Sequence, residues 1–192
     1  MDSTEAYESK AIEFLRSRDQ SPIGKNVVSR WARQLKCGAS VIELGCGGGF
    51  PITFALHSTG LRLWAVDSSP TLVAEFQSRF PDVPVQCDRV QESRFFSRKY
   101  NAAIAVGLIF LLSEPDQCAL ISRIANILLP GGRFLLTAPI ETGSWVDVNT
   151  GLVCNSLGQM VYEDLFSKAG FRTLSTFTDA GENNYYDIEL IS

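Results

Sequence analysis

The chain has 192 residues, of which 45% are hydrophobic and 20% are charged, and its formal net charge is −4. This length suits one globular domain with a substantial core, and the composition is that of a soluble protein. The negative charge weighs against a broad nucleic-acid footprint, and no apolar run approaches the roughly 20 residues of a membrane-spanning helix.

The first residues and the cysteines indicate a cytoplasmic protein. Residues 1–5 are polar and acidic, unlike a secretory signal, and the five cysteines form no C-x-x-C pair. Free thiols in a reducing cytoplasm are therefore expected. We expect no metal site, because the one histidine, His57, has no metal-like spacing to a cysteine.

Residues 5–36 carry apolar positions at helical spacing. One helix is predicted around Tyr7 to Leu15 and a second around Val27 to Leu35. The polar stretch 16–24 between them ends in Pro22 and Gly24 and is expected to be a loop or hinge.

A strand, a tight turn and a helix follow. Residues 40–44 are apolar and β-branched, glycines occupy four of the positions 45–49, and a helix is predicted from Pro51. The glycines allow a turn that approaches a ligand closely, and the helix N-terminus offers unpaired N–H groups to an anion or carboxylate. The nicotinamide-type fingerprint would need a glycine where Phe50 stands.

The second and third predicted strands each end at an acidic residue. Residues 61–66 lead to Asp67, about 20 residues after the glycines, where a carboxylate can accept hydrogen bonds from both hydroxyls of a ribose. Ser68 or Ser69 is expected to cap the next helix, with Pro70 at its start. The short strand 83–87 contains a proline, which suits a sheet edge, and Asp88 follows it, placed to cap a helix or to contact a ligand.

Residues 100–112 are almost continuously apolar, as in a central parallel strand that is covered on both faces. A helix is predicted from Glu114 to Leu129, and Pro130-Gly131-Gly132 leads into a strand at 133–138. This alternation of strands and helices predicts an α/β fold with a doubly wound, mostly parallel sheet.

The regular pattern is interrupted at residues 139–158, which we expect to form a long aromatic and acidic loop at the carboxyl edge of the sheet. A helix is predicted at 157–169, and strands at 171–177 and 185–191 are joined by a hairpin at 178–184. The loop 139–158 is either a mobile lid over a substrate or a fixed structural cover.

The string Glu43-Leu44-Gly45-Cys46-Gly47-Gly48-Gly49 resembles the first motif of class I S-adenosylmethionine-dependent methyltransferases. The acidic Asp67 and the Leu-Pro-Gly-Gly turn after a helix are similar to further features of that family, and the resemblance covers roughly residues 38–192. It implies a single domain with a Rossmann-like, seven-stranded sheet whose last strand is antiparallel. Residues 1–38 would be a helical cap, which either covers the cofactor mouth or only covers a sheet edge.

The resemblance also implies which residues hold the cofactor S-adenosylmethionine. Asp67 would bind the ribose, Asp88 the adenine amino group, and Gly107 would let the backbone lie close to the methionine portion. The full expected set comprises Glu43, Gly45, Cys46, Gly47, Gly49, Asp67, Ser68, Asp88, Arg89, Val90 and Gly107.

The expected reaction is in-line methyl transfer to a small molecule, for which a general base is optional. Residues 105–108 lack the Asn/Asp-Pro-Pro-aromatic string of enzymes that methylate amino groups of nucleic acids, and no Pro-Cys nucleophile of cytosine methylases is present. Because a general base is optional, methyl transfer leaves no obligatory catalytic signature in a sequence. Position alone suggests, on the substrate side, Tyr7, Phe110, Glu141, Trp145, Asp147 and Asn184.

Several alternatives remain open at this stage. The substrate could be a protein or an RNA, the domain could bind its cofactor without catalysis, or the fold could serve a dinucleotide-dependent oxidoreductase. His57 is expected to be a surface or satisfied helix residue, and Cys154 would carry a thiol-assisted methylation only as a minor alternative. The sequence leaves open the methyl acceptor, the atom methylated and the oligomeric state.

Overall fold

The computed structural model describes residues 3–148 and 150–191 and has a mixed seven-stranded sheet at its centre. The strand order is β3-β2-β1-β4-β5-β9-β8, with β1 to β5 parallel and β9 antiparallel to both of its neighbours. This confirms the predicted fold class. The strands are β1 Ser40–Leu44, β2 Arg62–Asp67, β3 Val85–Cys87, β4 Tyr100–Ala105, β5 Leu128–Thr137, β8 Phe171–Thr178 and β9 Asn184–Leu190.

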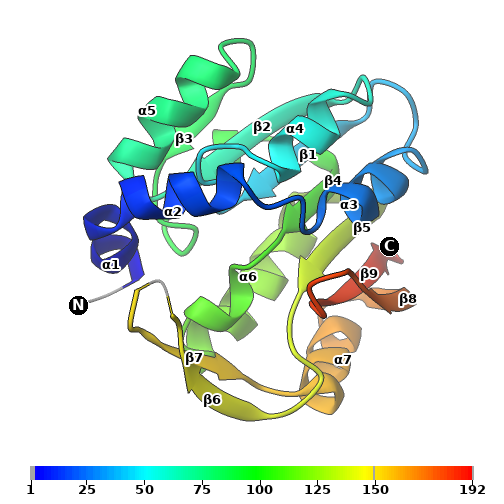
Figure 1. The fold of residues 1–192 in the computed structure, drawn as a ribbon. Coiled ribbons are helices and arrows are strands. Elements are labelled where there is room, and N and C mark those ends of the chain that lie inside the picture. Colours follow the sequence, from blue (N-terminus) through cyan, green and yellow to red (C-terminus); the bar gives the residue numbers. More distant parts are fainter. Residues whose placement is uncertain (1–2, 149, 192) are drawn as a thin grey trace.

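Helices cover both faces of the sheet (Figure 1). They are α1 Ser3–Ser9, α2 Ala11–Asp19, α3 Lys25–Ala32, α4 Ile52–His57, α5 Pro70–Arg79, α6 Glu114–Ile127 and α7 Gln159–Lys168. Buried side chains of α3, α4 and α5 form one core cluster, and those of α6 and α7 form another. Helices α1 and α2 lie across the carboxyl ends of the strands (Figure 1). None of the helices in the described part of the chain is long and apolar enough to cross a membrane.

Apolar side chains of β1 point to both faces of the sheet, so both faces have to be covered by helices. Val41 packs into the cluster with α3 to α5, whereas Ile42 and Leu44 pack into the cluster with α6 and α7. The predicted cap Ser69 is present at the start of α5, and Ser113 caps α6 in the same way. The Oγ atom of Ser69 accepts a hydrogen bond from the Leu72 N–H at 3.2 Å, and that of Ser113 accepts one from the Asp116 N–H at 3.3 Å.

The N-terminal region forms three helices, so the prediction of two was wrong. A break at Lys10 separates α1 from α2, and α2 continues to Asp19, which leaves only residues 20–24 as the connection to α3. Residues 16–19 looked like part of a loop because they are polar, but the other face of α2 packs Leu15 against Leu72 of α5.

The long apolar segment 100–112 is a strand only as far as Ala105. Gly107 has a φ of +71°, which turns the chain away from the sheet, and a 3₁₀ turn follows at Ile109–Leu111. The hydrophobic pattern continued past the strand because Ile109 and Leu112 are themselves buried. The structure thus corrects the predicted end of this strand.

The predicted loop 139–158 contains an antiparallel hairpin, which the sequence analysis missed. Strand β6, Gly143–Val146, pairs with β7, Val153–Ser156. Every residue of β6 is exposed, so its sequence lacks the alternation of buried and exposed positions that identifies a strand. In Figure 1 the turn of this hairpin reaches α1.

Candidate active site

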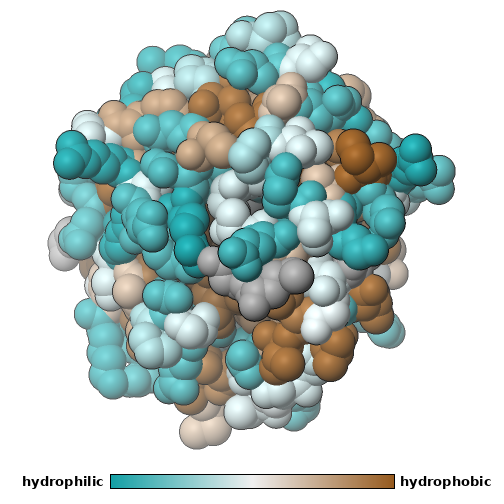
Figure 2. All heavy atoms as spheres, turned by 90° about the vertical axis from the view of Figure 1, so that its left-hand side faces the viewer, coloured by the Kyte–Doolittle hydropathy of each residue, from teal (hydrophilic) through white to brown (hydrophobic). Residues whose placement is uncertain are grey.

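A cavity of about 310 Å³ opens at the carboxyl ends of β1, β2 and β4. The strand order reverses between β1 and β4, and ligands of open α/β sheets bind at such a switch point. The glycine loop, the ends of β2 and β3, residues 106–112, helices α1 and α2 and the hairpin turn all contribute to its wall. Figure 2 shows the molecule from the side on which α1 and α2 lie, where hydrophilic residues cover most of the surface.

The glycine loop runs directly along the cavity. Gly45, Gly47 and Gly48 line it, and the Gly47 N–H donates a 2.8 Å hydrogen bond to Oδ2 of Asp67. Gly49, which was also expected to hold the cofactor, is not among the residues that line the cavity. A Cβ atom on Gly49 would lie 2.4 Å from Cε2 of Phe80, so this glycine is needed for packing.

Asp67 is held in a fixed orientation at the end of β2. Its Oδ2 atom accepts the Gly47 N–H and its Oδ1 atom accepts the Ser69 N–H at 3.0 Å. The residue is 9% exposed, and burial raises the pKa of its carboxyl group. Each carboxylate oxygen has a second lone pair, so this group can still accept hydrogen bonds from a ligand in the cavity.

Glu43 is the second buried carboxyl group of the cavity wall. Its Oε2 atom accepts a 2.6 Å hydrogen bond from Oγ1 of Thr53 on α4. Burial is the main reason that its pKa is raised to about 8, while the bond from Thr53 partly opposes this. In the ligand-free protein this carboxyl group is therefore mostly protonated at neutral pH.

The segment after β3 lines the other end of the cavity through Asp88, Arg89 and Val90. The Asp88 N–H donates to the Asp67 carbonyl oxygen at 2.9 Å, which ties the ends of β2 and β3 together. No helix begins directly after Asp88, because the next helical element in the described chain is the 3₁₀ turn Phe95–Ser97, so the alternative role as a helix cap was wrong. Gly107, at the end of β4, also lines the cavity and donates its N–H to Oγ1 of Thr137 at 2.7 Å.

The proposed acceptor-side residues divide into two groups. Tyr7, Phe110 and Asp147 line the cavity, and the Tyr7 hydroxyl lies 3.5 Å from Oδ2 of Asp147. Trp145 stands behind the wall, with its ring 5.3 Å from that of Phe110, and does not line the cavity.

Asn184 and Glu141 are also outside the lining. The Asn184 side chain is buried and donates to the carbonyl oxygen of Ala138 at 3.1 Å, which joins β9 to the end of β5. Glu141 is exposed in the bend before β6. Both residues were expected near the acceptor because of their position in the sequence. In the structure the Asn184 side chain joins two strands, and the Glu141 side chain faces solvent.

Arg18 is a cavity residue that the sequence analysis missed. Its guanidinium lines the cavity from α2, and burial lowers its pKa while Tyr185 and Asp179 oppose that shift. The available signal was helical spacing, because Arg18 lies four residues after Phe14, which also lines the cavity. Its position in a polar stretch made it look like a solvated loop residue.

His57 and Cys154 lie outside the lining of the cavity. Nε2 of His57 lies 2.8 Å from Oδ2 of Asp82 on the outer surface, as expected for a satisfied helix histidine. Cys154 is fully buried in β7, does not line the cavity, and has a pKa raised to about 11 by burial and then by Asp147. These properties argue against a thiol-assisted reaction at Cys154.

Helices α1 and α2 are fastened to α5 at two points. At the first point, the Glu8 carboxylate accepts hydrogen bonds from the Ser69 hydroxyl and from the Thr71 hydroxyl. It also accepts one from the Thr71 N–H at 3.2 Å. These bonds lower the pKa of Glu8.

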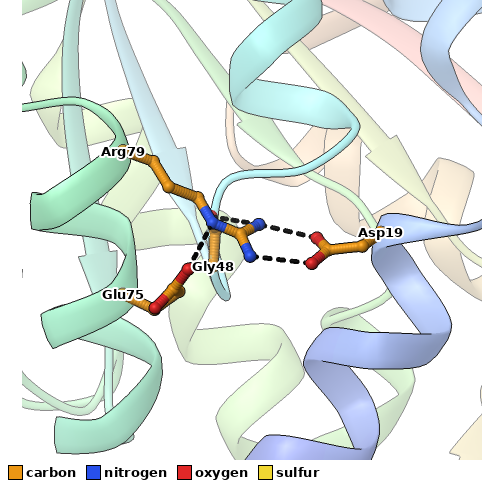
Figure 3. Close-up of polar contacts among 4 residues, drawn as sticks. All are labelled: Asp19, Gly48, Glu75 and Arg79. Carbon is orange, nitrogen blue, oxygen red and sulfur yellow. Dashed lines mark hydrogen bonds and ion pairs between the residues drawn. The ribbon is translucent and has the colours of Figure 1, made fainter.

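At the second point, Arg79 of α5 donates two hydrogen bonds to Asp19, at 2.6 and 2.7 Å (Figure 3). The same guanidinium binds Glu75 at 2.7 Å and the carbonyl oxygen of Gly48 at 3.4 Å. Arg79 therefore connects the helical cap with the glycine loop of the cavity.

Comparisons with known proteins agree with this geometry. The family model of a methyltransferase domain matches residues 41–132. The chain is 32% identical over 120 residues to the ubiquinone biosynthesis O-methyltransferase of Xanthomonas oryzae pv. oryzae, which is 61% of this chain and 49% of that protein. The corresponding protein of Xylella fastidiosa is 30% identical over 103 residues, 52% of this chain and 42% of that one. The chain thus spans about half the length of the curated relatives it matches.

Solved structures share most of this fold. A magnesium protoporphyrin IX methyltransferase from Synechocystis PCC 6803 with bound S-adenosylmethionine superimposes with a TM-score of 0.70 at 16% identity, covering 86% of this chain and 77% of that one. The glycopeptide N-methyltransferase MtfA, complexed with the same compound, gives a TM-score of 0.73 at 15% identity, covering 88% and 94%. The chain is thus similar to methyltransferases in the sequence of residues 41–132, and it shares its fold and sheet order with structures of such enzymes.

Proposed function

We propose that the protein transfers a methyl group from S-adenosylmethionine to a small-molecule acceptor. The observation that carries this proposal is the cavity at the switch point of the sheet, in which the glycine loop and the fixed carboxylate of Asp67 stand side by side. A volume of about 310 Å³ lies within the range of small-ligand sites.

The cavity offers a partner for each part of that cofactor. Asp67 would accept the ribose hydroxyls, and Asp88 and Val90 would contact the adenine. The methionine portion would lie along Gly45 and Gly107, with the guanidinium of Arg18 available to its carboxylate. The other predicted cofactor residues in the lining are Glu43, Cys46, Gly47, Ser68 and Arg89.

The cofactor, when bound, supplies a methyl group on a positively charged sulfur, which is already reactive toward nucleophiles. The residues of this chain then have to align the acceptor and exclude water. Tyr7, Phe110 and Asp147 lie where the acceptor would enter, between the helical cap and the hairpin. We assign them to acceptor binding.

We also propose that α1, α2 and the hairpin β6–β7 form a lid over this cavity. Tyr7 and Arg18 come from the helices and Asp147 from the hairpin turn, and the two segments meet in the cavity wall where Tyr7 approaches Asp147. The Glu8 and Asp19 contacts to α5 are polar and partly exposed, and such contacts can open at small free-energy cost.

Two observations favour a small molecule over a protein or RNA. The cavity is bounded on several sides by the cap and the hairpin, and the net charge of the chain is negative. A catalytically inactive binding domain is disfavoured because the glycine loop, Asp67 and Asp88 are all in place. The five cysteines are free thiols, which is consistent with a protein that acts in the reducing cytoplasm.

Calorimetric titration tests the proposal directly. The purified chain is titrated with S-adenosylmethionine, with its demethylated product S-adenosylhomocysteine, and with NAD. We expect saturable binding of the first two and none of NAD. Binding of NAD without any response to the sulfonium compound would contradict the assignment.

A further inference from the structure

The carboxylate of Asp147 is placed apart from the other acidic groups of the cavity. Glu43, Asp67 and Asp88 stand at the ends of β1, β2 and β3, where the cofactor would lie. Asp147 comes instead from the turn between β6 and β7, on the side where α1 meets the hairpin. It therefore brings negative charge to the acceptor side of the cavity.

This carboxylate is held in place by its own turn. The Asp147 N–H donates to the Leu152 carbonyl oxygen at 2.7 Å, and the Gly151 N–H donates to the Asp147 carbonyl oxygen at 2.7 Å. Its Oδ2 atom accepts the Thr150 N–H at 3.1 Å and the Thr150 hydroxyl, and the Tyr7 hydroxyl approaches at 3.5 Å. The charge is thus oriented before any acceptor arrives.

Aromatic rings also line this cavity, and one of them, that of Tyr7, lies beside Asp147. Tyr7 and Phe14 line it and contact each other edge to face, with ring centres 5.3 Å apart. Phe110 lines it from the 3₁₀ turn and is backed by Trp145. Aromatic faces beside a carboxylate favour a cation, because both the ring quadrupole and the charge attract it.

The same arrangement disfavours an anionic acceptor. A phenolate or carboxylate oxygen brought to the methyl group would stand close to Asp147 in a partly desolvated site, where like charges repel strongly. The neighbouring groups already respond to this charge. After burial, the largest cause that raises the pKa of both Tyr7 and Cys154 is Asp147.

We propose that the methyl acceptor is an amine, held in its ammonium form by the Asp147 carboxylate against the rings of Tyr7 and Phe110. This inference rests on the proposed methyl transfer and names the substrate class of the same site. In the reacting step the ammonium first gives a proton to solvent, and its nitrogen lone pair forms the new N–C bond. The S–CH₃ bond breaks, its electron pair stays on sulfur as a neutral thioether, and the product is a methylated ammonium.

The first test measures binding to the complex of the protein with S-adenosylhomocysteine. Calorimetry compares the dissociation constants of 2-phenylethylamine, its neutral analogue 2-phenylethanol and its anionic analogue phenylacetate. A charge-assisted hydrogen bond should favour the amine over the alcohol by at least about tenfold. Asp147→Asn keeps an acceptor for the Thr150 N–H and removes the charge, so this preference should fall to less than about threefold. Asp164→Asn, whose side chain is exposed on α7, should leave it unchanged.

The second test needs no knowledge of the acceptor. The protein is incubated with methyl-labelled S-adenosylmethionine and a small-molecule extract of the producing organism. We expect label in a product that a cation exchanger retains at neutral pH and that alkali does not release. Label in a neutral product or in an alkali-labile ester would overturn the inference while leaving methyl transfer intact.

Absence of label, together with absence of cofactor binding, would instead overturn the proposed function. Equal or tighter binding of the alcohol or of phenylacetate, or a preference that survives in Asp147→Asn, would also contradict the amine assignment. So would cofactor binding with no detectable binding of the amine at millimolar concentration. A melting temperature of Asp147→Asn close to that of the parent protein would show that a change in binding does not come from lost structure.

Discussion

Glu43 makes the stability of the ligand-free protein depend on pH. Its pKa rises from an ordinary 4.5 to about 8 on folding, mainly through burial, so between these values the folded state binds a proton that the unfolded state has lost. The stability from this proton is fully present below about pH 4.5 and is lost, at most by about 1.4 kcal/mol per pH unit, until about pH 8.

We therefore expect Glu43→Gln to gain stability over the parent protein as pH rises from 5 to 8. Glutamine retains an oxygen to accept the Thr53 hydroxyl and has no charge to bury. Urea unfolding at several pH values measures the difference, with exposed Glu163→Gln as the control. Parallel stability curves for parent and Glu43→Gln would show that Glu43 does not titrate in this window.

Asp67 has a structural role in addition to its proposed contact with the ribose. Because its two oxygens accept the Gly47 and Ser69 N–H groups, Asp67→Asn turns an amide N–H₂ toward one backbone donor. We expect a loss of about 1–3 kcal/mol in unfolding free energy and of about 1.5–3 kcal/mol in cofactor binding. Urea unfolding and calorimetry measure the two separately. An unchanged affinity for S-adenosylhomocysteine would remove Asp67 from the cofactor site.

At the residue scale, prediction from sequence succeeded where the chemistry is local. The strand-turn-helix around the glycine loop and the cap Ser69 depend on a few neighbouring residues, so their patterns were readable. Arg18 was missed because its role depends on where α2 lies relative to β1. The packing of Gly49 against Phe80 could not be predicted, because Phe80 is distant in the chain.

At the scale of elements, the helical cap is expected to move separately from the sheet. Helices α1 and α2 contact the body through the carboxylates of Glu8 and Asp19 and a small apolar cluster with α5. Such a segment opens at lower free energy than the core strands do. We expect amide hydrogen exchange in residues 5–24 and 143–156 to slow when S-adenosylhomocysteine is added, while exchange in β1 and β4 stays unchanged.

The double variant Glu8→Gln, Asp19→Asn sharpens this test. It weakens both attachments to α5, so exchange in residues 5–24 of the ligand-free protein should become faster than in the parent protein. Exposed Asp164→Asn is the matched control, since its partner Lys168 lies on the same helix. Equal protection with and without ligand in the parent protein would mean that these segments are a fixed cover.

The order of most helices and strands along the chain was predictable, because the helices repeat apolar positions at helical spacing and the buried strands are short apolar runs. The exceptions have physical reasons. Strand β6 is exposed along its whole length, and the apolar run at 100–112 continues past β4 into a buried 3₁₀ turn. How the hairpin meets α1 depends on long-range contacts such as Tyr7 with Asp147, which no local pattern encodes.

At the scale of the whole molecule, cofactor binding should stabilise the folded state. A ligand that binds only the folded protein adds about 2.7 kcal/mol when present at 100 times its dissociation constant. For a chain of 192 residues this raises the melting temperature by roughly 5–10 °C. We expect this shift with S-adenosylhomocysteine and none with NAD.

The shift in melting temperature caused by the ligand should depend on single residues of the cavity. The cavity wall draws on β1, β2, the segment after β4, α1, α2 and the hairpin turn, so a ligand inside it joins elements that are distant in sequence. The shift should be smaller in Asp67→Asn at the same ligand concentration, because the occupied fraction falls with affinity. It should be unchanged in Asp164→Asn, whose side chain is exposed on α7. Equal shifts in the parent protein and Asp67→Asn would indicate that the ligand binds somewhere other than the glycine loop. Differential scanning calorimetry at matched ligand concentrations makes this comparison.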